Sequence, residues 1–376
     1  MSGTPNSIMQ IDACLRQFPD SINLSKGDYN FSASQTEGFK NYFSQVLDKP
    51  QIYLQSAGQE ELRAKIAKEY GLQMNNVCVT EGGMHALYCL LWIFRERGSD
   101  VIIGNPVWEA YRFPTKVTDG VLIKVDYSTN ENILEHILPG KTRVVILNNP
   151  ENPTTVTYGF EKIKELAKEL FDKNVPLIVD EVYRKIRYDG TELKSCAELI
   201  HDFPNVAVVE SFSKAYAMTG WRVGYILADE SVIEKLKIDE EGNPIRGTIT
   251  SVPEPSQYAA IYCLDNQKDI IPWVVGKLKK RRDALYPYLR DIKGLKVKEP
   301  TSTIYFWIDH EEFSKDDVKI GTELIKKKHI GTVFGSIFGS RGQGCQRLSF
   351  GNIDDSRIDE CGEKFVDFFN SFNQTL

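Results

Sequence analysis

The sequence predicts an α/β protein in which a mostly parallel sheet with helices on both faces is joined to a smaller α+β domain. Strand-like and helix-like segments alternate between about residues 57 and 230. The strand-like segments are almost continuously apolar, which is typical of strands buried on both faces. After about residue 270 the pattern changes to one long helix and short alternating strands. We expect a large domain over residues 41–270 and a small domain formed by residues 1–40 and 271–376.

The elements of the expected large domain follow from periodicity and from turn residues. The segment GQEELRAKIAKEYG has apolar residues at helical spacing, and FEKIKELAKELFDKN reads as an amphipathic helix between two strands. The segment MHALYCLLWIFRERG is apolar around most of a helix, so that helix is expected to be buried. Each strand ends in polar or turn residues. In chain order we expect helices at 58–71 and 84–98, strands at 100–106 and 143–150, a helix at 160–174, and strands at 175–181 and 206–212.

The remaining segments predict the smaller domain. Residues 269–292 form a long helical pattern, which we expect to be broken near Pro287 because proline lacks the N–H that a helix uses. The first 40 residues are expected either to join this domain or to lie across a ligand site. Strands are expected at 301–309 and 346–350, with helices near 315–329 and at about 355–372.

Composition excludes several classes of function. The 376 residues carry a net charge of −6, which gives no electrostatic reason to expect nucleic acid or an anionic membrane as partner. No apolar run reaches the length of a membrane span, and the first residues do not resemble a signal peptide, so we expect a cytoplasmic protein. The seven cysteines are scattered without a CxxC pair, so neither a disulfide framework nor a metal site is expected.

Polar residues follow the predicted strands where ligands bind in open α/β sheets, outside the carboxyl ends of the strands. Asp180 is one of them. It could cap a turn, or its charge could stabilise a cationic nitrogen on a ligand. Tyr183 could reach the same ligand or belong to the core. Asn152 lies in NNPENPTT, where the Asn-Pro steps make a turn on the same rim.

The segment SFSKAYAMTGWR places Lys214 among residues that bind anions. Ser211, Ser213 and Arg222 suit a phosphate, and the glycine pair before the helix at 84–98 offers backbone N–H groups to it. If Lys214 is partly desolvated and close to Arg222, its pKa falls and its amine becomes a nucleophile toward an aldehyde. An amine, a phosphate cradle and a carboxylate for a ring nitrogen together indicate pyridoxal 5′-phosphate.

At this point the chain resembles the class I and II aminotransferases, which are fold-type I pyridoxal-phosphate enzymes. The resemblance covers nearly the whole chain and is carried by NNPENPTT, DEVY, SFSKAYAMTGWRVGY and QRLSF, in the family's order. It implies that Lys214 forms a Schiff base with the cofactor and later moves a proton. It also implies that Asp180 pairs with the ring nitrogen, while Asn152 and Tyr183 bond the phenolic oxygen of the ring.

The resemblance implies further contacts. Gly83 and Met84 would offer backbone to the phosphate held by the serines and the arginine, and Trp108 would stack on the ring. Arg347 would bind the substrate α-carboxylate. Tyr53 would reach the cofactor of a neighbouring subunit, which implies a homodimer with shared sites.

Three positions depart from the family's usual pattern, and none removes a cofactor contact. Thr155 replaces a glycine, while Tyr29 and Phe334 stand where proline is common. Gly27 and Tyr29 are expected to face the substrate, so the substrate side chain and the reaction type stay open.

Three functions are compatible with these residues. The first is an aminotransferase that converts an L-amino acid into a 2-oxo acid. The second is a pyridoxal-phosphate cyclase or lyase acting on an arginine-derived amino acid in natural-product biosynthesis. The third is a non-catalytic pyridoxal-phosphate sensor, although no basic module precedes the motifs. A dehydrogenase is excluded, because no GxGxxG follows a strand.

Overall fold

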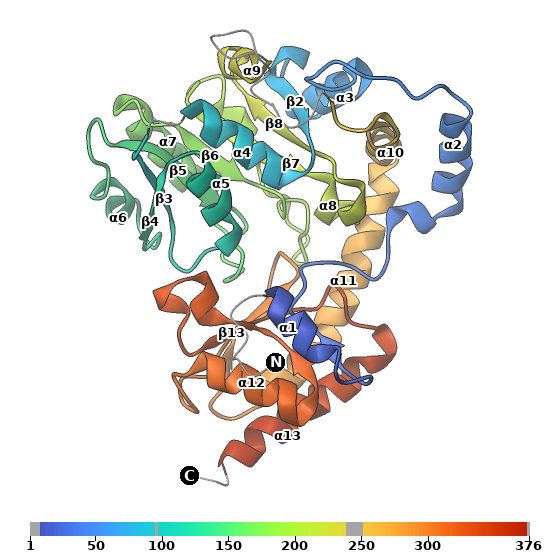
Figure 1. The fold of residues 1–376 in the computed structure, drawn as a ribbon, viewed down its shortest axis with the longest axis vertical. Coiled ribbons are helices and arrows are strands. Elements are labelled where there is room, and N and C mark those ends of the chain that lie inside the picture. Colours follow the sequence, from blue (N-terminus) through green and yellow to red (C-terminus); the bar gives the residue numbers. More distant parts are fainter. Residues whose placement is uncertain (1–7, 95–96, 238–250, 374–376) are drawn as a thin grey trace.

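The computed structural model describes residues 8–94, 97–237 and 251–373, and it contains a large sheet that confirms the expected fold class (Figure 1). The sheet has seven strands, of which only β8 runs antiparallel to its neighbours. Their order is β2 (Val77–Thr80), β8 (Gly224–Ala228), β7 (Val206–Ser211), β6 (Leu177–Asp180), β5 (Thr142–Asn148), β3 (Asp100–Gly104) and β4 (Val121–Val125).

Both faces of this sheet are buried, which explains the almost continuous apolar strands. Alternate strand residues such as Ile146 and Ile178 pack with α4 (Gly83–Phe94) on one face. Their neighbours Val145 and Leu177 pack with α7 (Phe160–Asp172) on the other. Because most strand residues meet a hydrophobic layer, the strands show little polar alternation, and the exception is the edge strand β4, where Val121 is exposed and Lys124 half-buried.

A second, smaller sheet lies on the opposite side of the cavity described below (Figure 1). It is antiparallel, and its strands pair in the order β12, β13, β10 and β9. The helix α12 (Asp317–Lys328) and the helix α13 (Ile358–Asn373) belong to this part. The strands are β12 (Val333–Phe334), β13 (Cys345–Ser349), β10 (Tyr305–Asp309) and β9 (Lys296–Val297).

One long helix joins the two parts, and the break that we expect near Pro287 does not occur. The helix α11 (Gln267–Arg290) continues through Pro287 and runs from α10 (Glu254–Asp265) down to the smaller sheet (Figure 1). Pro287 lies in its last turn, so the missing N–H removes one bond close to the helix end. The buried neighbours Leu285 and Leu289 hold that turn in place.

The N-terminal segment both packs against the smaller part and contributes to the wall of the cavity. The helix α1 (Ile8–Leu15) packs through Ile11 and Leu15 against the smaller part, and β1 (Ile22–Asn23) pairs with β11 (Ile330–Gly331) in parallel. The residues that follow β1 reach the cavity between the two parts. None of the helices that the structure describes is long and apolar enough to cross a membrane.

Candidate active site

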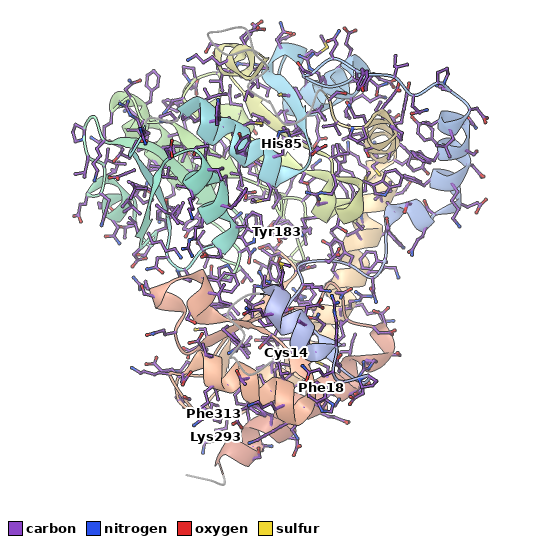
Figure 2. All side chains as sticks on the ribbon, in the orientation of Figure 1. Cys14, Phe18, His85, Tyr183, Lys293 and Phe313 are labelled. Carbon is purple, nitrogen blue, oxygen red and sulfur yellow. The ribbon has the colours of Figure 1, made fainter. Side chains whose placement is uncertain are left out.

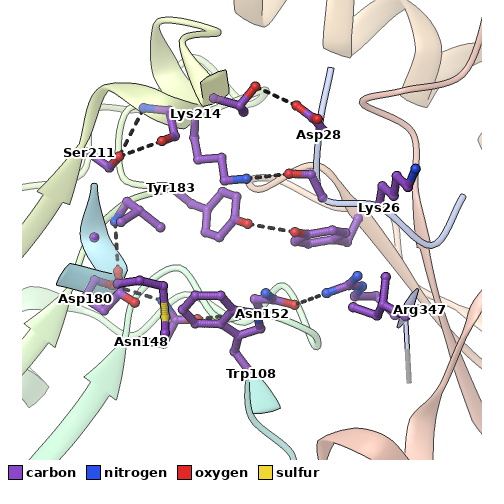
Figure 3. A pocket seen from close by; sticks show the side chains of 18 of the residues that line it. Lys26, Asp28, Trp108, Asn148, Asn152, Asp180, Tyr183, Ser211, Lys214 and Arg347 are labelled. Carbon is purple, nitrogen blue, oxygen red and sulfur yellow. Dashed lines mark hydrogen bonds between the residues drawn. The ribbon is translucent and has the colours of Figure 1, made fainter. Parts of the chain in front are cut away.

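A cavity of about 390 Å³ lies between the carboxyl edge of the large sheet and the smaller sheet (Figure 3). Three parallel strands that are neighbours in the sheet, β5, β6 and β7, end at its wall. Their ends bring to it the polar residues that the sequence placed on one rim. The lining residues are Ile8, Lys26, Gly27, Asp28, Gly83, Met84, Trp108, Asn148, Asn152, Asp180, Val182, Tyr183, Ser211, Ser213, Lys214, Thr219, Arg222, Tyr305 and Arg347.

Lys214 is not a solvated surface residue. It lies on the short helix α8 (Phe212–Ala215), directly after β7, and its Nζ donates to the carbonyl oxygen of Gly27 at 2.5 Å. Desolvation is the main cause that lowers the pKa of this amine, and nearby Arg347 and Arg222 lower it further. Both causes expected from the sequence, desolvation and the proximity of Arg222, act on this amine, and desolvation contributes more. A lysine with a lowered pKa is available as a nucleophile and as a base.

Asp180 ends β6 as a buried carboxylate on the cavity wall. The hydroxyl of Tyr111 donates to its Oδ2 at 2.7 Å, and the backbone N–H of Val182 donates to its Oδ1 at 3.3 Å. Desolvation raises the pKa of Asp180 to about 6 despite these two hydrogen bonds. A buried carboxylate with a raised pKa favours a cationic partner, because an opposite charge offsets the cost of its ionisation.

Arg347 crosses from β13 of the smaller sheet to the cavity, where it is 1% exposed. Its Nη1 donates to Asn152 Oδ1 at 3.0 Å and its Nη2 to the carbonyl oxygen of Ser25 at 2.8 Å. The guanidinium stacks on Tyr305, 4.3 Å from the ring centroid. Its Nε is buried without a hydrogen-bond partner among the described residues. A buried cation with an unused donor is suited to an incoming carboxylate.

Tyr183 lies where the two parts of the molecule face each other (Figures 2 and 3), and Tyr305 lines the same cavity from β10. Their hydroxyl oxygens are 2.8 Å apart and share a hydrogen bond. Burial raises the pKa of Tyr183, so this hydroxyl stays protonated near neutral pH. It can therefore donate a hydrogen bond to an oxygen on a ligand.

The opposite end of the cavity forms an anion cradle. Ser211 Oγ caps α8 by accepting from the N–H of Ser213 at 3.1 Å, and it donates to the hydroxyl of Ser213 at 2.9 Å. Arg222 lies beside them, with its guanidinium donating to the carbonyl oxygens of Thr219 and Glu81. The N-terminus of α4 begins at Gly83 on the same wall. Two hydroxyls, a guanidinium and the backbone N–H groups of a helix N-terminus fit a phosphate.

Close packing of backbone explains the glycines of this cradle. Gly82 has φ of +77°, and a Cβ there would lie 2.5 Å from Nη2 of Arg222. A Cβ on Gly224 would lie 2.8 Å from Cα of Gly82. Both positions therefore require glycine for the guanidinium to lie against the turn before α4.

Two of the expected site residues do not line the cavity. Tyr53 is 87% exposed on the surface, away from the cavity of its own chain. Tyr29 is buried in the main hydrophobic core and packs against Phe31. The other expected residues, from Gly27 to Arg347, are brought together as expected.

Four residues at or beside the site were not expected from the sequence, namely Tyr305, Tyr111, Asn148 and Thr219. A signal existed for three of them: Tyr111 comes three residues after Trp108, Asn148 is the first residue of NNPENPTT, and Thr219 lies within SFSKAYAMTGWR. No signal marked Tyr305, because it arrives from the other sheet.

Comparison with known proteins agrees with this geometry. The family model described as aminotransferase class I and II matches residues 19–365. The aspartate aminotransferase of Thermotoga maritima is 30% identical over 381 residues, covering 96% of this chain and 96% of that protein. The aspartate aminotransferase of Sulfolobus acidocaldarius is 31% identical, covering 85% and 82%.

Solved structures show the same architecture. The Thermotoga maritima aspartate aminotransferase structure has a TM-score of 0.83 at 27% identity, covering 98% of both chains. The Thermus thermophilus aspartate aminotransferase structure with maleate has a TM-score of 0.85 at 25% identity, covering 97% of both chains.

Proposed function

Because this chain belongs to the aminotransferase class I and II family and is an amino acid aminotransferase, we propose that its cavity binds pyridoxal 5′-phosphate through Lys214. One observation carries the proposal. The same cavity holds an amine with a lowered pKa, a buried carboxylate and an anion cradle. These groups match the aldehyde, the ring nitrogen and the phosphate of that cofactor.

When bound, the cofactor supplies an aldehyde for attachment and a ring that accepts electrons. Lys214 provides the attaching amine, and after release it moves the proton of the substrate α-carbon. Its lowered pKa leaves more of the amine unprotonated at neutral pH, which both tasks require. The carbonyl oxygen of Gly27 accepts a hydrogen bond from this amine and thereby fixes the position of the amine in the cavity.

The remaining residues bind and orient. We propose that Asp180 holds the protonated ring nitrogen and that Tyr111 keeps this carboxylate in place. Arg347 receives the substrate α-carboxylate, for which its Nε is unused. In the same proposal Asn152 and Tyr183 bond the phenolic oxygen, Trp108 stacks on the ring, and Ser211, Ser213, Arg222 and the backbone of Gly83 and Met84 hold the phosphate.

The proposal extends to the assembly and its domains. The exposed Tyr53 supports a homodimer in which it reaches the neighbouring cofactor. We keep the division into a large domain over residues 41–270 and a small domain formed by residues 1–40 and 271–376, and a cytoplasmic location. Gly27 is kept as a substrate contact. For Tyr29 we propose an indirect role, since its ring lies in the core. We choose amino transfer over cyclisation or elimination because the relatives named above are aminotransferases.

The test uses the purified chain loaded with pyridoxal 5′-phosphate. Borohydride reduction followed by peptide mass spectrometry is expected to place the cofactor on Lys214. Amino acids should discharge the colour of the bound cofactor and yield a 2-oxo acid. Lys214→Ala should lose the covalent attachment and reduce turnover by about 10²-fold or more. Attachment at another lysine, or consumption of amino acids without any 2-oxo acid, would refute the proposal.

A further inference from the structure

Part of the cavity wall is assigned no direct contact with the cofactor or the α-carboxylate in the proposed function. It is formed by the segment after β1 and its neighbours, namely Ile8, Lys26, Asp28 and Thr219. In Figure 3 Asp28 lies above the Lys214 amine and Arg347 lies below it. If the α-carboxylate is held at Arg347 and the α-carbon is near Lys214, the far end of a long side chain can extend toward Asp28.

Asp28 presents a fixed and unpaired charge. Its Oδ1 accepts from the hydroxyl of Thr219 at 2.6 Å and from its neighbour's backbone N–H at 2.8 Å. No ion pair joins Asp28 to any residue that the structure describes, and its Oδ2 accepts no hydrogen bond there. The negative charge of Asp28 interacts with the amine of Lys214 and acts to raise its pKa. The carboxylate is therefore oriented in advance, with one oxygen unused.

The cation closest to Asp28 along the chain is already engaged. Lys26 also lines the cavity, but its Nζ forms a 2.8 Å ion pair with Asp12 on α1. The hydrogen bond from Lys26 is the main cause of the lowered pKa of Asp12. Figure 3 shows the Lys26 side chain leaving the cavity. The other cations on the cavity wall are Lys214, Arg222 and Arg347, each of which has a role in the proposed function.

We propose that the substrate is an amino acid whose side chain ends in an ammonium or guanidinium group, which Asp28 binds. This inference rests on the proposed function, because it assumes that Arg347 and Lys214 hold the other end of the substrate. A second carboxylate, as in aspartate, would face the charge of Asp28 without a free cation among the described residues. Glu81, another acidic residue of this region, does not line the cavity.

The first test measures turnover by the cofactor-loaded enzyme. Arginine, lysine and ornithine are compared with norleucine, citrulline and aspartate. Asp28→Asn keeps the size and the acceptor for Thr219 but removes the charge. It should lower kcat/KM for the cationic substrates about 10- to 100-fold more than kcat/KM for norleucine, mainly through KM, whereas any change in the pKa of Lys214 would affect all substrates alike. Asp48 is exposed on the surface, and Asp48→Asn alters the net charge by the same amount. This control should change kcat/KM neither for the cationic substrates nor for norleucine.

The second test measures binding without amino transfer. By calorimetry, 5-guanidinopentanoate, which lacks the α-amine, should bind more tightly than hexanoate, and Asp28→Asn should abolish the difference. This result decides the inference even if no amino acid is turned over, an outcome that would defeat the proposed function alone. Equal binding of the two acids, a preference for aspartate, or an equal loss for all substrates in Asp28→Asn would overturn the inference.

Discussion

Asp180→Asn tests whether the site is built around a buried charge that needs a partner. In the cofactor-free protein, burial raises the pKa of Asp180 to about 6 from an ordinary value of 3.8, while the side chain is 2% exposed. Below pH 3.8 the carboxyl is protonated in both the folded and the unfolded chain. Between the two pKa values the folded chain holds the proton more tightly. The stability from this carboxyl is therefore lost as pH rises through about 6.

The magnitude follows from the two pKa values. The difference between 6 and 3.8 corresponds to about 3 kcal/mol of unfolding free energy, because each pKa unit corresponds to about 1.4 kcal/mol. About 1.3 kcal/mol of this is lost between pH 5 and pH 7. Asparagine has no proton to lose, so Asp180→Asn should gain stability relative to the unsubstituted protein by that amount over the same interval. Other buried carboxyls cancel in the difference.

The assay is urea unfolding of both cofactor-free proteins at pH 5, 6 and 7. Adding cofactor at pH 7 should stabilise the unsubstituted protein more than Asp180→Asn, because a cationic ring nitrogen offsets the cost of the ionised carboxylate. A stability difference that stays constant from pH 5 to pH 7, or that changes in the opposite direction, would refute the argument that Asp180 is destabilised by burial.

Three further substitutions test other parts of the site. Arg347→Lys should lower kcat/KM for amino acids about 10²-fold or more by losing the two-pronged contact, and it should hardly affect amines without a carboxylate. Tyr305→Phe removes the hydroxyl that shares a hydrogen bond with Tyr183. This substitution should shift the pH midpoint of the cofactor colour and lower the free energy of unfolding by about 1 kcal/mol. Gly82→Ala forces a Cβ against Arg222 and should weaken cofactor binding at least about tenfold. Gly190→Ala, with φ of +73° and open space around it, should lose similar stability without losing cofactor affinity.

The cofactor end of the site could be predicted because it depends on local sequence and on one rule of sheet topology. Asn152, Asp180 and Ser211 each follow a strand of the parallel sheet or end it, so alignment of the strands is enough to gather them. The lowered pKa of Lys214 was also expected, but its main cause is burial, which only the folded chain reveals. The fold class could be predicted from the same strands, because their apolar residues indicate a sheet with helices packed on both faces.

Other features depended on packing between distant segments. Tyr305 lies on β10 and reaches Tyr183 from the other sheet, 122 residues further along the chain. Periodicity identifies a strand there but cannot tell which cavity its side chains face. The continuity of α11 at Pro287 depends on Leu285 and Leu289, whose burial outweighs one missing hydrogen bond. Tyr29 was expected at the substrate because of its place in the sequence, and packing places its ring in the core.

The residues for the reaction depend mainly on local sequence, whereas the residues for the choice of substrate depend on packing between distant segments. The groups that would carry amino transfer are supplied by strand ends of the large sheet and by β13, which a family model detects from sequence. The side-chain end of the cavity depends instead on the pairing of β1 with β11 and on the ion pair between Lys26 and Asp12. The Thermotoga maritima relative is 30% identical to this chain, so most of its residues differ from those found here. The name of a relative therefore predicts the reaction better than the substrate, and the charge of Asp28 is the more direct guide to the latter.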